Sequence, residues 1–194
     1  MKSSKPSEGS IVAGCRRGDM AAFRDLYTVY SKQLYRACCA MLGNEHDAQD
    51  VLQVVFTEAY RKFHRYDGTS KLSTWLYGIL TRVVSNQRRS IRRRVRLAEV
   101  YGSEPDSANP TSGTMERRAA AKQTLAYLAT ALQEIPERKR LAFVLYYIQG
   151  MTLEEVAAIT GISAQGAFGR VKSARAVLLE RFWNDAENET EEVS

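Results

Sequence analysis

Hydrophobic residues recur at spacings of three and four along most of this chain, the period of amphipathic α-helices. In the first half, three long helices are predicted, and glycine, asparagine or aspartate stands at several of their expected ends. Their buried stripes are expected to be Phe23, Leu26, Tyr27, Tyr30, Leu34, Cys38 and Met41; Val51, Leu52, Val55, Phe56, Ala59 and Phe63; and Trp75, Leu76, Ile79, Leu80, Val83 and Val84. A short helix over residues 10–17 precedes them. No stretch has the alternation of a β-strand.

The clearest interruption of the helical pattern lies over residues 98–116, a run rich in Gly, Pro, Ser, Asn and Asp. Such a run predicts a flexible linker. Helical periodicity then resumes, and Pro136 suits the start of a helix. We therefore expect an all-α protein with two small helical domains, over residues 10–97 and 117–183. The polar residues 1–9 and the acidic residues 184–194 are expected to be disordered tails.

The stretch from Thr152 to Leu179 predicts a helix, a tight turn and a second helix. Thr152 and Glu155 have the spacing of a capping box, and Gly161 suits the turn. Ser163 can cap the second helix, whose buried stripe is expected to be Ala167, Val171, Ala174 and Leu178. The opposite face carries Gln165, Phe168, Lys172 and Arg175. This is the pattern of a helix-turn-helix that enters the DNA major groove, although an ordinary helical hairpin would also fit it.

Charge supports a nucleic-acid partner. The formal net charge is +6, and residues 82–96 hold seven arginines and no acid. Arg82, Asn86, Arg89 and Arg93 share one helical face, which suits contact with phosphates. Among the aromatic residues near this helix, Phe63 and Trp75 are expected in the core, and Tyr66 is expected to contact an unpaired base.

A second polar face lies near the start of the helix that follows Asn44. It carries Asp47, Asp50 and Gln53. Carboxylates in the first turn of a helix interact favourably with the helix dipole. A solvent-exposed helix start therefore explains this face as well as a docking surface for a partner does. Periodicity alone does not decide between the two.

Little in the sequence suggests an enzyme or a metalloprotein. The cysteines, Cys15, Cys38 and Cys39, lack the spacing of a zinc site, and His46 and His64 stand in no catalytic or metal-binding pattern. We expect no cofactor. No apolar run is long enough for a membrane span and no signal peptide is evident, so a cytoplasmic protein is expected.

Two segments of the chain resemble the extracytoplasmic-function (ECF) type of bacterial RNA polymerase sigma factors. The first, from Gly18 to Ile79, contains the runs DAQDVLQVVFTEAY and STWLYGI and is similar to their second-region domain. The second, from Ile135 to Phe182, begins with IPERKRLAFVLYYIQGMTLEEVAAITGIS and is similar to their fourth-region domain. The resemblance implies a sigma factor that directs promoter-specific initiation by core polymerase.

The resemblance also implies a role for each surface. Asp47, Asp50 and Gln53 would face the clamp helices of the beta-prime subunit, and the second domain would contact the beta flap. The minus-10 element would be melted and bound by Tyr66, Ser70, Lys71, Arg82, Asn86 and Arg89. The minus-35 element would be read by Ser163, Gln165, Phe168, Arg170, Lys172 and Arg175. An anti-sigma factor would hold the free protein.

The second helix of the helix-turn-helix departs from the family. Relatives commonly carry a Thr-Val-Lys-Ser-Arg-Leu run where residues 166–171 read Gly-Ala-Phe-Gly-Arg-Val. Arg82 also replaces a frequent asparagine. The alternative to a sigma factor is a helix-turn-helix regulator that binds operator DNA without polymerase, but it leaves the acidic face and the Tyr66 loop unexplained.

Overall fold

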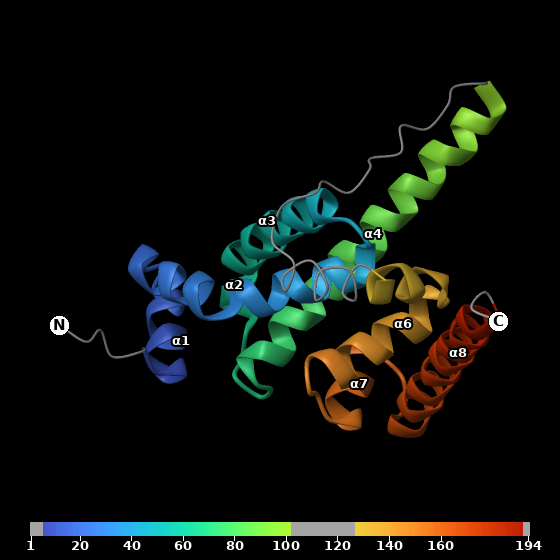
Figure 1. The fold of residues 1–194 in the computed structure, drawn as a ribbon. Helices are drawn as coiled ribbons and strands as arrows, with labels where there is room; N and C mark the ends of the chain where they lie inside the picture. Colours follow the sequence, from blue (N-terminus) through green and yellow to red (C-terminus); the bar gives the residue numbers. More distant parts are fainter. Residues whose placement is uncertain (1–5, 102–126, 192–194) are drawn as a thin grey trace, which may run out of the picture.

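The computed structural model describes residues 6–101 and 127–191, with side chains described for 6–89 and 127–184. Every regular element in these ranges is helical, which confirms the all-α prediction. The first domain consists of α1 (Glu8–Arg16), α2 (Met20–Leu42), α3 (Glu45–Lys62), the short 3₁₀ helix η1 (Phe63–Arg65) and α4 (Leu72–Tyr101) (Figure 1).

Local capping accounts for the boundaries inside this domain. The carboxylate of Asp19 accepts a hydrogen bond from the Ala21 amide at 2.8 Å and caps α2. Gly43 ends α2 with φ of 86°, a left-handed conformation that favours glycine. Asn44 then accepts from the Asp47 amide at 2.7 Å and caps α3. Except for Tyr27, which is 50% exposed, the predicted stripes are buried or partly buried, and these three helices pack around one hydrophobic core.

The second domain begins with a helical segment over residues 127–134. It continues through α6 (Glu137–Phe143), the π-helical turn η2 (Val144–Ile148), α7 (Leu153–Thr160) and α8 (Ala164–Glu191). Pro136 caps α6 with a backbone that is not yet helical. A small core of Ala131, Leu132, Ile135, Ala174 and Leu178 joins the helical segment to α8.

Three helices extend beyond the predicted domain boundaries. The predicted N-terminal tail (1–9) overlaps α1. Ser7 caps this helix, and the side chain of Glu8 is held by two hydrogen bonds to the rest of the domain. The Glu8 carboxylate accepts hydrogen bonds from the Tyr30 hydroxyl at 3.0 Å and the Leu72 amide at 3.3 Å. Helix α4 runs to Tyr101 and α8 runs to Glu191, past the predicted ends at 97 and 183. The rest of the predicted linker, residues 102–116, lies outside the described residues.

The two domains pack directly against each other. Helix α7 lies against α4, and η2 and α6 lie against α2 (Figure 1). Eight apolar residues of the second domain belong to the same core cluster as the first domain: Ala142, Val144, Leu145, Met151, Val156, Ala157, Ala167 and Val171. The two domains therefore share part of their hydrophobic core in this structure.

Candidate nucleic-acid interface

The helix-turn-helix is formed by α7 and α8. Both hydrogen bonds of the predicted capping box are present: the Glu155 amide donates to the Thr152 hydroxyl, and the Thr152 amide donates to the Glu155 carboxylate. Gly161 ends α7 with φ of 68°, in the left-handed region. The Ser163 hydroxyl accepts from the Gly166 amide at 3.1 Å and caps α8. The sequence prediction for this element is confirmed down to its caps.

Helix α8 has one buried and one exposed face, as its periodicity predicts. The buried stripe consists of Ala167, Val171, Ala174 and Leu178, each at most 5% exposed. On the other side, Gln165, Lys172 and Arg175 are exposed, and Arg170 is half-buried. Phe168 stands among the polar residues with 53% of its surface exposed. The Phe168 ring is therefore solvent-exposed and does not contribute to the hydrophobic core.

Two glycines flank Phe168, and their surroundings differ. A Cβ atom at Gly169 would meet nothing within 4 Å, so no neighbour in the described structure requires glycine there. A Cβ atom at Gly166 would come within 3.3 Å of the Ser163 hydroxyl, which caps the helix. Glycine in a helix costs about 1 kcal/mol relative to alanine. These two glycines lower the intrinsic helix stability at the start of α8. No close packing around Gly169 offsets that loss.

The basic face of α4 is open to solvent. Arg82, Asn86 and Arg89 are all exposed, and the side chain of Arg93 lies outside the described residues. Arg88 points the other way: its Nη2 donates to the Met41 carbonyl at 2.5 Å and to Gln133 Oε1 at 2.6 Å. The arginine run thus divides between a solvent face and a contact with the second domain.

The Tyr66 ring is buried in this structure, with 5% exposure. It packs edge-on against Phe63 and tilted against Trp75, with ring centres 5.8 and 5.4 Å away. Its hydroxyl donates to the Ser70 carbonyl at 2.7 Å, and its carbonyl accepts from Arg16 at 3.0 Å. In this arrangement the ring is covered by Phe63 and Trp75, and its contact with a base stays a prediction. A base could stack on Tyr66 only after the ring leaves this cluster.

The neighbouring loop residues Ser70 and Lys71 are exposed, and Lys71 is paired with the second domain. Its Nζ lies 2.9 Å from a carboxylate oxygen of Glu155 on α7. The hydrogen bond between them raises the pKa of Lys71 and lowers the pKa of Glu155. Both groups are therefore charged at neutral pH. Sequence spacing gave no sign of this pair, since the partners belong to different domains.

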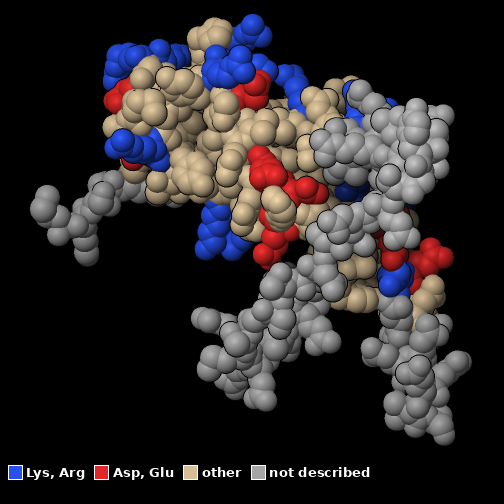
Figure 2. Space-filling model, turned by 90° about the horizontal axis from the view of Figure 1, so that it is seen from above, with Lys and Arg blue, Asp and Glu red and all other residues tan. Residues whose placement is uncertain are grey.

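The acidic face of α3 is accessible. Asp50 and Gln53 are exposed, and the Asp50 carboxylate lies 3.7 Å from Nδ1 of His46, itself a surface residue. Asp47 is half-buried, and its carboxylate accepts from the Asn44 side chain at 2.6 Å. Figure 2 shows a face of the molecule on which acidic side chains gather between separate groups of Lys and Arg. The net positive charge is therefore not one continuous patch on this face.

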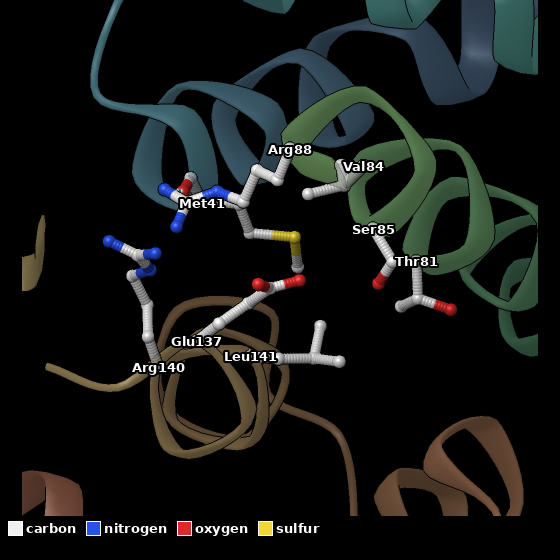
Figure 3. Close-up of a pocket in the computed structure, with 8 residues that line it drawn as sticks. All are labelled: Met41, Thr81, Val84, Ser85, Arg88, Glu137, Arg140 and Leu141. Carbon is white, nitrogen blue, oxygen red and sulfur yellow. Dashed lines mark hydrogen bonds between the residues drawn. The ribbon is translucent and has the colours of Figure 1, made fainter. Parts of the chain in front are cut away.

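A small cleft between the domains is lined by α2, α4 and α6 (Figure 3). Its lining is Met41, Thr81, Val84, Ser85, Arg88, Glu137, Arg140 and Leu141. Its volume of about 10 Å³ holds no more than one water molecule. Arg140 is only 2% exposed, and its Nη1 donates to the Leu132 carbonyl at 3.1 Å and to Gln133 Oε1. This is a structural junction and not a ligand site.

Neither a metal site nor a membrane span is found in the described part of the chain. No three His, Cys, Asp or Glu side chains gather there as metal ligands would. None of the helices described combines the length and hydrophobicity that crossing a bilayer demands.

Two packed helical domains, of which the second carries a helix-turn-helix, are typical of a DNA-binding protein that acts in transcription. Comparison with known families matches residues 26–94 to sigma-70 region 2 and residues 125–182 to sigma-70 region 4. The ECF RNA polymerase sigma factor SigW of Bacillus subtilis is 31% identical over 168 residues, covering 84% of this chain and 90% of SigW. The sigma factor CarQ of Myxococcus xanthus is 30% identical over 152 residues, covering 78% of this chain and 84% of CarQ.

Solved structures show the same fold. CnrH in complex with the cytosolic domain of CnrY superposes with a TM-score of 0.69 at 24% identity, covering 90% of this chain and 96% of CnrH. The chain belongs to the ECF RNA polymerase sigma factors. Its function is that of a sigma factor, and a regulator acting without polymerase is not favoured.

Proposed function

We propose that the first domain docks on core RNA polymerase through the acidic face of α3. Asp47, Asp50 and Gln53 would meet the clamp helices of the beta-prime subunit. The support is geometric: Asp50 and Gln53 are exposed on the outer side of α3, while the opposite side is core. Because Asn44 already caps this helix, the exposed carboxylate of Asp50 is not needed for that task.

The same domain binds the minus-10 element in this proposal. Arg82, Asn86 and Arg89 hold the DNA backbone from the exposed face of α4, and Ser70 and Lys71 contact the strand at the preceding loop. Tyr66 completes the base site once its ring has left the cluster with Phe63 and Trp75. An arginine face supports phosphate contacts, and an aromatic ring supports stacking on an unpaired base.

The second domain reads the minus-35 element in the major groove. The observation that carries this proposal is the exposed face of α8, a polar and aromatic surface opposite a fully buried stripe on a capped helix-turn-helix. The residues assigned to this contact are Ser163, Gln165, Phe168, Arg170, Lys172 and Arg175. The domain also contacts the beta flap of polymerase.

In this scheme the chain performs no bond chemistry of its own and acts in the cytoplasm with polymerase. An anti-sigma factor restrains the free protein. A related fold supports this partner class: the sigma factor RpoE of Bartonella quintana was solved with the anti-sigma factor NepR, at a TM-score of 0.66 and 24% identity, covering 81% of this chain and 94% of RpoE.

Reconstituted transcription tests the proposed division of labour. The purified chain is added to core polymerase on genomic DNA, and transcript starts are mapped. We expect starts that share two upstream motifs about two helical turns apart. Starts with no shared upstream motif would contradict promoter reading by the two domains, and absence of the chain from a core polymerase pull-down would contradict the docking face.

Phe168 provides a sharper test of the minus-35 contact. Its exposed ring suits an apolar contact with a thymine methyl group in the major groove. Phe168→Ala and Phe168→Lys are compared with Leu179→Ala, which removes a similarly exposed side chain further along α8. We expect only the Phe168 variants to change base preference in the minus-35 motif. Unchanged preference in both would refute the contact.

A further inference from the structure

Helix α1 contacts both ends of the loop that leads into α4, through one charged side chain at each of its own ends. At its C-terminal end, the Arg16 guanidinium donates from Nη2 to the Tyr66 carbonyl at 3.0 Å. At its N-terminal end, the Glu8 carboxylate accepts from the Leu72 amide at 3.3 Å. We call residues 66–72 the capture loop, because the proposed function places base capture there. The two contacts therefore hold the first and the last residue of this loop.

Both contacts come from one short helix that is fixed to the core. Helix α1 has 9 residues, so its first and last residues lie about 12 Å apart along the helix axis. Ile11 and Cys15, between them, are 2% and 3% exposed and belong to the core of the first domain. The two ends of the capture loop are thus held at one fixed separation.

Glu8 also supplies a cap that the sequence next to α4 lacks. The residue immediately before Leu72 is Lys71, whose side chain has no acceptor for the free amides of the first helical turn. The Glu8 carboxylate accepts from the Leu72 amide with one oxygen and from the buried Tyr30 hydroxyl, at 3.0 Å, with the other. A carboxylate at this end of a helix also interacts favourably with the helix dipole. The start of α4 is therefore positioned by α1.

Arg16 lies over the turn of the capture loop as well as on its first carbonyl. Gly68 makes this turn with φ of 85°, and a Cβ atom there would lie 3.5 Å from the Arg16 guanidinium. The Asp67 carboxylate accepts from the Thr69 amide at 2.9 Å and closes the turn from inside the loop. The backbone of the loop is therefore ordered from within and held from outside by α1.

We propose that Arg16 and Glu8 are positioning residues for recognition of the minus-10 element: they fix the backbone of the capture loop, so that only the Tyr66 ring has to move when a base enters. This inference rests on the proposed capture of a base at this loop. Base discrimination requires contacting groups held to within about 0.5 Å, whereas phosphate contacts carry no sequence information. Loosening the loop should therefore reduce base discrimination more than total affinity.

A direct contact between Arg16 and a DNA phosphate predicts a different result. Losing a phosphate contact weakens binding to every base by the same factor, and it reduces the slope of log affinity against log salt by about 0.7 for a single strand. Losing a positioning contact reduces the discrimination between bases. Arg17→Met is the matched control for Arg16→Met, because it removes the same charge from the next residue, whose side chain is also exposed.

The first measurement is binding of single-stranded probes to the holoenzyme assembled from core polymerase and the full chain. Five fluorescein-labelled strands share an abasic backbone; four carry one central A, C, G or T, and the fifth carries no base. The ratio of the weakest to the tightest affinity among the four measures base discrimination, and the fifth measures backbone contact alone. We expect discrimination to fall about fivefold in Arg16→Met and to stay unchanged in Arg17→Met, with the same salt slope in both variants.

The other end of the loop gives an independent comparison. Glu8→Ala removes the acceptor for the Leu72 amide, whereas Glu8→Gln keeps an oxygen that can accept the same hydrogen bond. We expect Glu8→Ala to lose discrimination and Glu8→Gln to retain it. Discrimination in Glu8→Ala equal to that of the unchanged chain would overturn the role of Glu8.

A measurement without DNA or polymerase reports on the loop itself. In a Trp183→Phe background Trp75 is the remaining tryptophan, and its ring centre lies 5.4 Å from that of Tyr66. Acrylamide quenching of its fluorescence should increase in Arg16→Met and stay unchanged in Arg17→Met. Circular dichroism checks that both variants keep the helical fold.

Two results would overturn the positioning role of Arg16. One is equal base discrimination and equal quenching in Arg16→Met and Arg17→Met. The other is unchanged discrimination in Arg16→Met together with a smaller salt slope than that of Arg17→Met, which would assign Arg16 to a phosphate. If quenching responds as expected but the unchanged chain binds all five strands equally, the proposed base capture is the part that fails.

Discussion

Replacing Arg140 with methionine should destabilise the second domain far more than its position on a short helix suggests. Its guanidinium is 2% exposed and donates to the Leu132 carbonyl and to Gln133 Oε1. Leu132 is in the last turn of the helical segment 127–134, and besides Arg140 its carbonyl accepts a hydrogen bond from the Ile135 amide at 3.3 Å. Methionine keeps the aliphatic length of the side chain but leaves that carbonyl and the glutamine oxygen without this donor.

The size of the effect follows from those two bonds. A hydrogen bond to a charged group contributes about 1.5–3 kcal/mol, and removing the buried charge returns part of its desolvation cost. We expect Arg140→Met to lower the free energy of unfolding by about 3 kcal/mol. Urea unfolding followed by circular dichroism measures it, with Arg138→Met, exposed on the same helix, as the control. A loss below about 1 kcal/mol, or one equal to that of the control, would refute the reasoning.

Further expectations follow from the described contacts. Gly169→Ala should raise the free energy of unfolding by about 1 kcal/mol in the same urea assay, because its Cβ meets no neighbour. Burial raises the pKa of the Cys38 thiol to about 12, so alkylation near pH 8 should be more than about a hundredfold slower in the folded chain than in urea. Asp50→Asn should weaken core polymerase binding in a pull-down, while Glu58→Gln, on the same helix, should not. The hydrogen bond from Lys71 lowers the pKa of Glu155, so as the pH falls the ion pair should persist through the ordinary glutamate pKa and be lost only below it; an NMR titration of the Glu155 carboxylate, with Lys71→Met as the comparison, checks this.

The features predicted correctly from the sequence are those that local chemistry determines. The caps of α7 and the buried stripe of α8 involve residues within a few positions of one another, so spacing alone identifies them. The family resemblance also rests on such short runs, and the comparisons confirm it.

Side chains whose partners are distant in the sequence were not predictable in the same way. The Tyr66 carbonyl accepts a hydrogen bond from the Arg16 guanidinium, 50 positions earlier in the chain. Glu8 falls in a polar terminus and yet accepts hydrogen bonds from Tyr30 and Leu72. A polar or aromatic residue carries no local signal of a partner that folding brings to it.

The joining of the domains has a related physical cause. Periodicity shows that Val144, Leu145 and Val156 are buried, but it does not show which element covers them, and part of their cover comes from the first domain. A chain with these residues has apolar surface to lose when its domains separate, at about 25 cal/mol for each Å² exposed. Any partner that separates the two domains must therefore supply this free energy through its own binding. The size of this shared core therefore determines how much free energy separating the two domains costs.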